Sequence, residues 1–127
     1  LFSVAKNPVD MSRIVFSEYH AAGSITASYM IRHNQYKYIY YVGYRPELYD
    51  LENDPEELND ISKKPESQKI LIEYESILRK ILDPEKTDKS AKKDQRELVE
   101  SYGGREHLLK RGGINTTPAP GKKAKFT

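Results

Sequence analysis

The chain has 127 residues but no cysteine, no tryptophan and no long apolar run. Without cysteine it can form no disulfide framework and no thiolate metal site, and it has no cysteine nucleophile. No stretch approaches the roughly 18 apolar residues of a membrane-spanning helix, so we expect no membrane partner. The motifs G-x-S-x-G, G-x-G-x-x-G and the P-loop are missing as well. These absences leave no visible apparatus for nucleophilic catalysis within the chain.

Charge is unevenly distributed along this length, which fits a single domain. Residues 1–60 carry 5 basic and 9 acidic residues, whereas residues 61–127 carry 16 basic and 10 acidic residues. From Lys110 to the end there are basic residues and no acidic residue. A basic tail is typical of binding to an acidic partner or nucleic acid, but more often of a solvated terminus. Composition does not fix the compartment.

Four short segments rich in β-branched and aromatic residues predict four β-strands. They cover residues 13–19, 27–32, 36–42 and 47–51. The connections are short, with Gly23 and Asn34 as turn residues, so we expect an antiparallel meander in an α+β fold. Alternation places Tyr38 and Tyr40 on one side of the third strand and Ile39 and Tyr41 on the other. Because neither side is cleanly polar, we expect both faces of the sheet to be covered.

After the strands, the apolar period changes to that of a helix. Residues 65–82 predict a helix that starts at Pro65, ends near Pro84 and covers one face of the sheet. Its apolar stripe consists of Ile70, Tyr74, Ile77, Leu78 and Ile81. A weaker second helix is expected over about 88–102, followed by a short turn over 105–111 and an irregular tail from 114. The expected organisation is a connecting segment 1–12, a sheet-plus-helix domain 13–82, and a helical extension with a basic tail 83–127.

Two kinds of ligand site can be weighed from the residues alone. The acidic segment 50–57 suggests a calcium-binding loop. However, Pro55 stands where an EF-hand requires glycine. A solvated turn after a strand explains the carboxylates instead. Tyrosines and Lys37 in the third strand suggest base stacking, but the glycines of an RNA-binding strand motif are missing and residues 1–60 are net acidic. We therefore expect no metal site and no nucleic acid.

Residues 15–20, 29–32, 36–39 and especially 47–58 resemble the C-terminal region of type I sulfatases, in the alkaline-phosphatase-like superfamily. The most specific part is Leu-Tyr-Asp-Leu-Glu-x-Asp-Pro-x-Glu at 48–57. The resemblance is strong over 13–62 and weaker over 63–121. It implies a small C-terminal subdomain, a four-stranded antiparallel sheet with a helix on it, that packs against the catalytic α/β domain of the same parent chain.

The resemblance also implies chemistry that this chain does not carry. A sulfatase uses a formylglycine made within Cys/Ser-x-Pro-x-Arg, and calcium bound in the large domain; neither the motif nor the ligands are recognisable here. The expected partners are therefore the catalytic domain and, through the parent, a sulfate-ester substrate. In similar sulfatases this subdomain flanks the active-site mouth. We expect His20 to line that mouth, with Glu18, Tyr19 and Ser24 orienting it or contacting substrate.

One alternative stays open. The chain could be a free-standing interaction module that uses its tyrosine-rich sheet or its basic tail. The start at Leu1, without methionine, favours a piece of a longer protein, and the two apolar sheet faces with one strong helix point to a missing domain.

Overall fold

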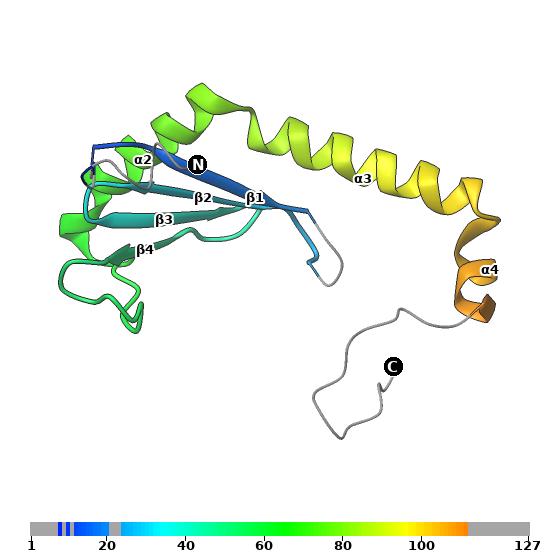
Figure 1. Cartoon of the computed structure of the whole chain (residues 1–127), viewed down its shortest axis with the longest axis horizontal. Helices are drawn as coiled ribbons and strands as arrows, with labels where there is room; N and C mark the ends of the chain where they lie inside the picture. The colour runs from blue at the N-terminus through cyan, green and yellow to red at the C-terminus, as the bar shows by residue number, and fades with distance from the viewer. Residues whose placement is uncertain (1–7, 9, 11, 21–23, 112–127) are drawn as a thin grey trace, which may run out of the picture. The chain divides into compact units, whose positions relative to one another are not determined.

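The computed structural model describes residues 8, 10, 12–20 and 24–111. The elements are strands β1 (Val15–Tyr19), β2 (Ser28–His33), β3 (Tyr36–Tyr41) and β4 (Glu47–Asp50), the 3₁₀ turn η1 (Pro65–Ser67), and helices α2 (Gln68–Ile81), α3 (Pro84–Ser101) and α4 (Gly104–Arg111) (Figure 1). The chain divides into two units, 1–90 and 91–127, which are described separately. The predicted tail from 114 and most of the predicted connecting segment 1–12 lie outside the described residues.

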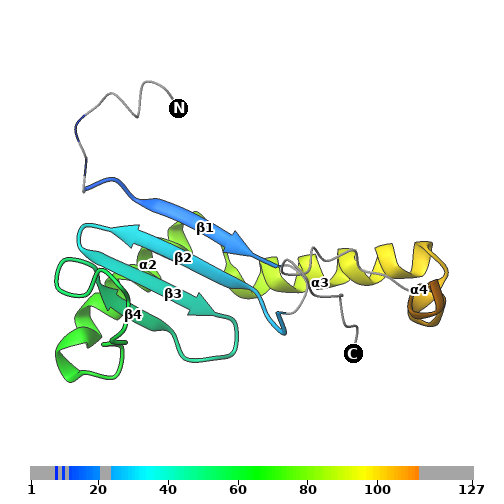
Figure 2. The ribbon, with the colours of Figure 1, turned by 60° about the horizontal axis from the view of Figure 1, so that its bottom comes forward.

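The four strands form one antiparallel sheet in the order β1-β2-β3-β4, so the predicted meander is confirmed (Figure 2). One row across the sheet consists of Phe16, Ile31, Tyr38 and Leu48, which are paired in register. Asn34 in the β2–β3 turn has φ 49°, a conformation that asparagine tolerates better than most residues. The strand boundaries differ from the sequence prediction by one or two residues.

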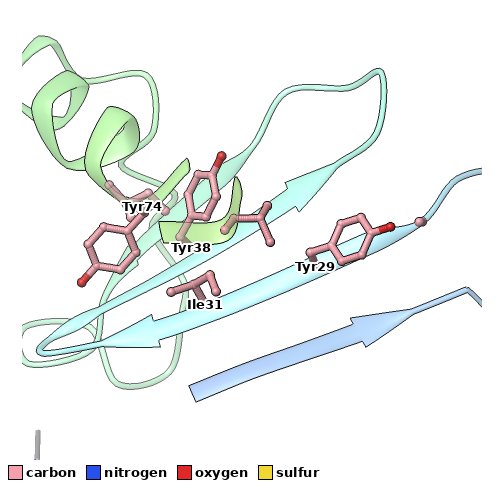
Figure 3. Close-up of a cluster of buried hydrophobic side chains, with 7 residues drawn as sticks. Tyr29, Ile31, Tyr38 and Tyr74 are labelled. Carbon is pink, nitrogen blue, oxygen red and sulfur yellow. The ribbon is translucent and has the colours of Figure 1, made fainter. Parts of the chain in front are cut away.

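Helix α2 covers one face of the sheet, and the core lies between them (Figure 3). Alternation sends every second side chain of each strand to this face. Tyr74 is the centre of the contact: its ring packs against Tyr36 and Tyr38, and its hydroxyl donates a hydrogen bond to the His33 carbonyl. The fully buried apolar residues are Ala27, Tyr29, Ile31, Tyr38, Leu48, Tyr74 and Leu78.

The predicted apolar stripe of α2 is buried only in part. Tyr74 and Leu78 are buried, and Ile70 and Ile77 pack against the core at its margin. Ile81 is 46 % exposed, because α2 ends there and the chain turns away from the helix at Leu82. The helix therefore packs against the sheet mainly through its middle turns.

Two predictions about the later helices are wrong. Helix α3 begins at Pro84, not near residue 88, because Pro84 suits the first helical turn and Asp83 caps it. The Asp83 carboxylate accepts a hydrogen bond from the Lys86 N–H at 3.0 Å. Residues 105–111 are not a turn but belong to α4, which follows Gly103 and Gly104, both with positive φ. The two glycines separate α3 from a further helix, whereas the sequence predicted only the end of a helix there.

Candidate docking face and the loop after β1

The face of the sheet opposite α2, called the open face here, contains no buried residue in the described part of the chain. Val15 is 36 % exposed and Tyr19 49 % exposed, and both belong to this face. By the strand register, the open face consists of Val15, Ser17, Tyr19, Ser28, Met30, Arg32, Lys37, Ile39, Tyr41, Glu47 and Tyr49. It combines large apolar and aromatic side chains with a few charged ones, a composition common at protein interfaces.

Several polar groups on the open face already have partners within the chain. The hydroxyls of Tyr41 and Tyr49 both donate to Glu47 Oε2, at 3.1 and 3.3 Å, and Lys37 donates to Glu57 at 2.6 Å. Burial, followed by the bond to Glu47, raises the pKa of Tyr41 to about 12, so this hydroxyl stays protonated. Lys37 and Glu47 therefore need little from a partner, which lowers the cost of covering them, whereas Arg32 forms no ion pair within the described residues.

Two of the predicted site residues meet at the end of β1. His20 Nε2 lies 3.3 Å from Glu18 Oε2, and the His20 ring packs edge-on against Tyr29 with 5.5 Å between ring centroids. Tyr29 is itself fixed, because its hydroxyl donates to the Pro84 carbonyl at 3.1 Å. Burial, and then the charge of Glu18, raise the pKa of Tyr29 to about 12. The imidazole is thus held against a rigid aromatic wall.

The other two predicted site residues are not part of this contact. Tyr19 precedes His20 and lies on the open face, because successive side chains of a strand alternate. Ser24 is exposed, and its hydroxyl donates to the Thr26 carbonyl two residues later. Residues 21–23, the middle of the predicted substrate loop, lie outside the described residues. Of the predicted set, the structure brings together His20 and Glu18.

A buried aspartate that the sequence analysis missed fixes the far end of this loop. Asp88 is only 6 % exposed, and its Oδ1 accepts a hydrogen bond from the Ala27 N–H at 2.9 Å. Ala27 immediately precedes β2, so the α3 side chain anchors the chain as it re-enters the sheet. No spacing rule could find this contact, because it joins residues 61 positions apart.

The corner between α2 and α3 is fixed to β3 by a charged network. Arg79 donates to Glu85 at 2.9 Å and to Glu75 at 2.9 Å, and its guanidinium lies over the Tyr40 ring. The Tyr40 hydroxyl donates to Glu85 at 2.6 Å. The bonds from Arg79 and Tyr40 lower the pKa of Glu85 to about 2. Glu85 is therefore ionised at neutral pH.

The acidic segment after β4 is a set of turns. Asp50 accepts a hydrogen bond from the Glu52 N–H, and Asp54 accepts from the N–H groups of Leu58 and Asn59. Such bonds satisfy the carboxylates locally, as a solvated turn requires. No group of three or more potential metal ligands gathers in the part of the chain that the structure describes.

Comparison with known proteins assigns the family. Residues 6–84 match the family model described as N-sulphoglucosamine sulphohydrolase, C-terminal. The chain belongs to this family of sulfatase C-terminal domains. It is 42% identical over 53 residues to Arylsulfatase K of Bos taurus, covering 39% of this chain and 10% of that protein. With Arylsulfatase K of Gallus gallus the identity is 40% over 72 residues, covering 54% and 13%.

Solved sulfatase structures are similar as well. A putative sulfatase from Bacteroides thetaiotaomicron gives 33% identity over 66% of this chain and 18% of that chain, with a TM-score of 0.48. A structure described as a 2-O GAG sulfatase gives the same values. The sulfatase C-terminal domain described here thus spans between a tenth and a sixth of the curated relatives' length. None of the helices in its described part combines the length and apolar character needed to cross a membrane.

Proposed function

We propose that this domain is part of a sulfuric ester hydrolase and packs through its open face against the catalytic α/β domain of the same parent chain. The observation that carries the proposal is the open face itself. Its strands bear Met30, Ile39 and three tyrosines, yet no described residue of the chain buries them. Sheets in α+β proteins bury an apolar face against a second layer, and large apolar patches mark interfaces.

The cofactors of such an enzyme would lie in the other domain. The family resemblance implies calcium and a formylglycine in the parent, and the described carboxylates of this chain do not fit a calcium site because turn N–H groups occupy them. The chemistry of sulfate-ester cleavage is therefore assigned to the catalytic domain. The role of the present chain is to stabilise that domain and to border its substrate.

We propose that His20 is the residue through which this domain reaches the substrate. It follows the end of β1, where a side chain can extend beyond the sheet, and it is positioned by Glu18 and Tyr29. An imidazole N–H can donate a hydrogen bond to an oxygen of an anionic ester. Glu18 would orient the ring, whereas Ser24 and Tyr19 would contribute only if the loop carried them toward the substrate.

Docking of the open face is tested by the same substitution in two proteins. Ile39→Asp places a carboxylate in the middle of the open face. In the 127-residue chain we expect a loss of unfolding free energy of about 1 kcal/mol, because Ile39 is only half-buried there and the new carboxylate lies opposite Glu47. In the full-length sulfatase we expect the same substitution to lower the unfolding free energy by at least about 3 kcal/mol, because the new charge would be buried without a partner.

The matched control is Leu98→Asp on α3, where the leucine is 59 % exposed. This variant should behave alike in the chain and in the full-length protein. Urea denaturation measures all four values. Equal effects of Ile39→Asp in both proteins would contradict docking through the open face and favour a free-standing module.

The role of His20 is tested by kinetics in the full-length sulfatase. His20→Ala should raise KM or lower kcat by about tenfold or more on an aryl sulfate, as expected for a lost bond to a charged group. The melting temperature should stay nearly unchanged. His107→Ala, an exposed histidine on α4, is the control and should leave both kinetics and stability intact. Loss of stability with unchanged kinetics per folded molecule would make His20 a packing residue.

A further inference from the structure

A second feature with ligand-binding character is a cleft at the β4 edge of the sheet, between α2 and the segments that flank β4. Its volume is about 510 Å³, which is within the range of small-molecule sites. The walls come from the β3–β4 connection, the segment before η1, and α2. The lining residues are Tyr38, Arg45, Pro46, Ser62, Lys63, Gln68, Leu71, Ile72 and Glu75.

The floor of the cleft carries a hydroxyl that nothing in the described chain satisfies. Tyr38 is only 1 % exposed, and its ring packs among Tyr40 and Tyr74. Figure 3 shows its hydroxyl directed away from Tyr74 and Ile31. No hydrogen bond joins this hydroxyl to any described residue, unlike those of Tyr29, Tyr40 and Tyr74. Burial, and then the charge of Glu75, raise the pKa of Tyr38, so the group stays protonated and is available as a donor.

The walls of the cleft supply further hydrogen-bond donors and positive charge besides the Tyr38 hydroxyl. Arg45 forms no ion pair within the described residues, so its charge is available to a ligand, whereas the charge of Lys63 is partly directed at the Asp60 carboxylate. Gln68 contributes an amide group, whose one bond, to the Ser62 carbonyl, is long at 3.5 Å. The one acidic lining residue, Glu75, shares Arg79 with Glu85, so with Arg45 and Lys63 the lining carries one net positive charge. The surplus of donors over acceptors selects for an anion.

We propose that this cleft binds an oxyanion, a sulfate or a carboxylate group of a small ligand, through the Tyr38 hydroxyl at its floor and the Arg45 guanidinium at its wall. Both anions present the same chemistry, negatively charged oxygens that accept two or more hydrogen bonds. Leu71 and Ile72 provide an apolar side for the rest of the ligand. The proposal concerns this chain alone and does not depend on the function proposed above.

Titration of the 127-residue chain by NMR tests this site. Sodium sulfate and sodium acetate are added separately at constant ionic strength, with sodium chloride as the reference. We expect saturable shifts of the Arg45 and Gln68 side-chain signals and of the Tyr38 ring, at millimolar concentrations. The anion whose binding curve saturates at the lower concentration identifies the preferred group, sulfate or carboxylate. Linear, unsaturated shifts up to about 100 mM, well beyond the weak end of specific affinity, would overturn the proposal.

Two variants localise the binding. Tyr38→Phe removes only the unpaired hydroxyl, and Arg45→Gln removes an exposed charge, so both should fold. Each should weaken binding by roughly tenfold, the effect of one hydrogen bond to a charged group. Lys80→Gln on α2 removes the same charge outside the cleft and should change affinity less than twofold. If Lys80→Gln and Arg45→Gln weaken binding equally, the anion responds to net charge and no site exists.

Discussion

The two faces of the sheet are made from the same strands and similar residues, but only one is a core. On the α2 side, Ile31 and Tyr38 are completely buried. Their chain neighbours Met30 and Ile39 point to the open face, and neither is buried. Apolar composition therefore does not decide burial within this chain; the presence of a covering layer does. Residues on the α2 side therefore stabilise the isolated chain, whereas residues on the open face would contribute to stability only when a second layer covers them.

The largest effect is expected from shortening a buried side chain of α2 that packs on the sheet. Leu78→Ala removes a side chain with 0 % exposure and should cost about 2–5 kcal/mol of unfolding free energy. Ile81→Ala, one turn later and 46 % exposed, should cost less than about 1 kcal/mol. Urea denaturation of the 127-residue chain measures both. Similar costs would mean that α2 extends its contact to its last turn.

A smaller effect is expected at Asp88. Asp88→Ala should cost about 1–3 kcal/mol, because the buried Ala27 N–H loses its acceptor. Asp88→Asn keeps an oxygen at the same place and should recover most of this loss. Thermal unfolding of the two variants makes the comparison. If Asn is as destabilising as Ala, the charge matters and the hydrogen bond to Ala27 does not.

A matched pair of methyl deletions compares the two faces directly. Ile31→Val should cost about 0.5–1.5 kcal/mol, the usual value for a buried site. Ile39→Val lies on the open face of the neighbouring strand and should cost less than about 0.5 kcal/mol in this chain. The shift of the denaturant midpoint of each variant, at an unchanged dependence of unfolding free energy on denaturant concentration, gives the two costs. Equal costs would show that the open face is already packed.

The smallest effect is a dependence on pH. The pKa of Glu85 is lowered to about 2 from an ordinary 4.5, so the ionised form stabilises the fold above pH 4.5, and this contribution is lost as the pH falls from 4.5 toward 2. Because the side chain is 42 % exposed, we expect less than about 1 kcal/mol. Glu85→Gln should remove this part of the pH profile; an unchanged profile would assign the loss to other carboxylates.

The sequence predicted the sheet well because its signals are local. Strands of five or six residues rich in tyrosine and isoleucine, separated by turn residues, specify a meander almost alone. The helix α2 was also predictable from its period and from Pro65. The start of α3 was missed because Pro84 was interpreted only as an end, although proline also suits a first helical turn. Helix α4 was missed because its eight residues carry no clear apolar stripe.

The candidate sites were less predictable, because they depend on contacts between distant residues. Proximity of His20 to Glu18 follows from strand spacing, whereas its packing on Tyr29 requires the register of β1 against β2. The link from Asp88 to Ala27 requires the direction of α3 after the corner. The isolated hydroxyl of Tyr38 could not be foreseen, since every tyrosine of the strand has the same sequence signature.

The order of the strands has a consequence for how fast this chain folds. Each strand pairs with its neighbour in sequence, so the sheet assembles by closing short loops, which costs little entropy and is quick. The bonds from Tyr74 to His33 and from Asp88 to Ala27 join residues 41 and 61 positions apart, and they can form only afterwards. During synthesis, the sheet can therefore be paired before α2 leaves the ribosome, while the face that α2 later covers is still exposed to water.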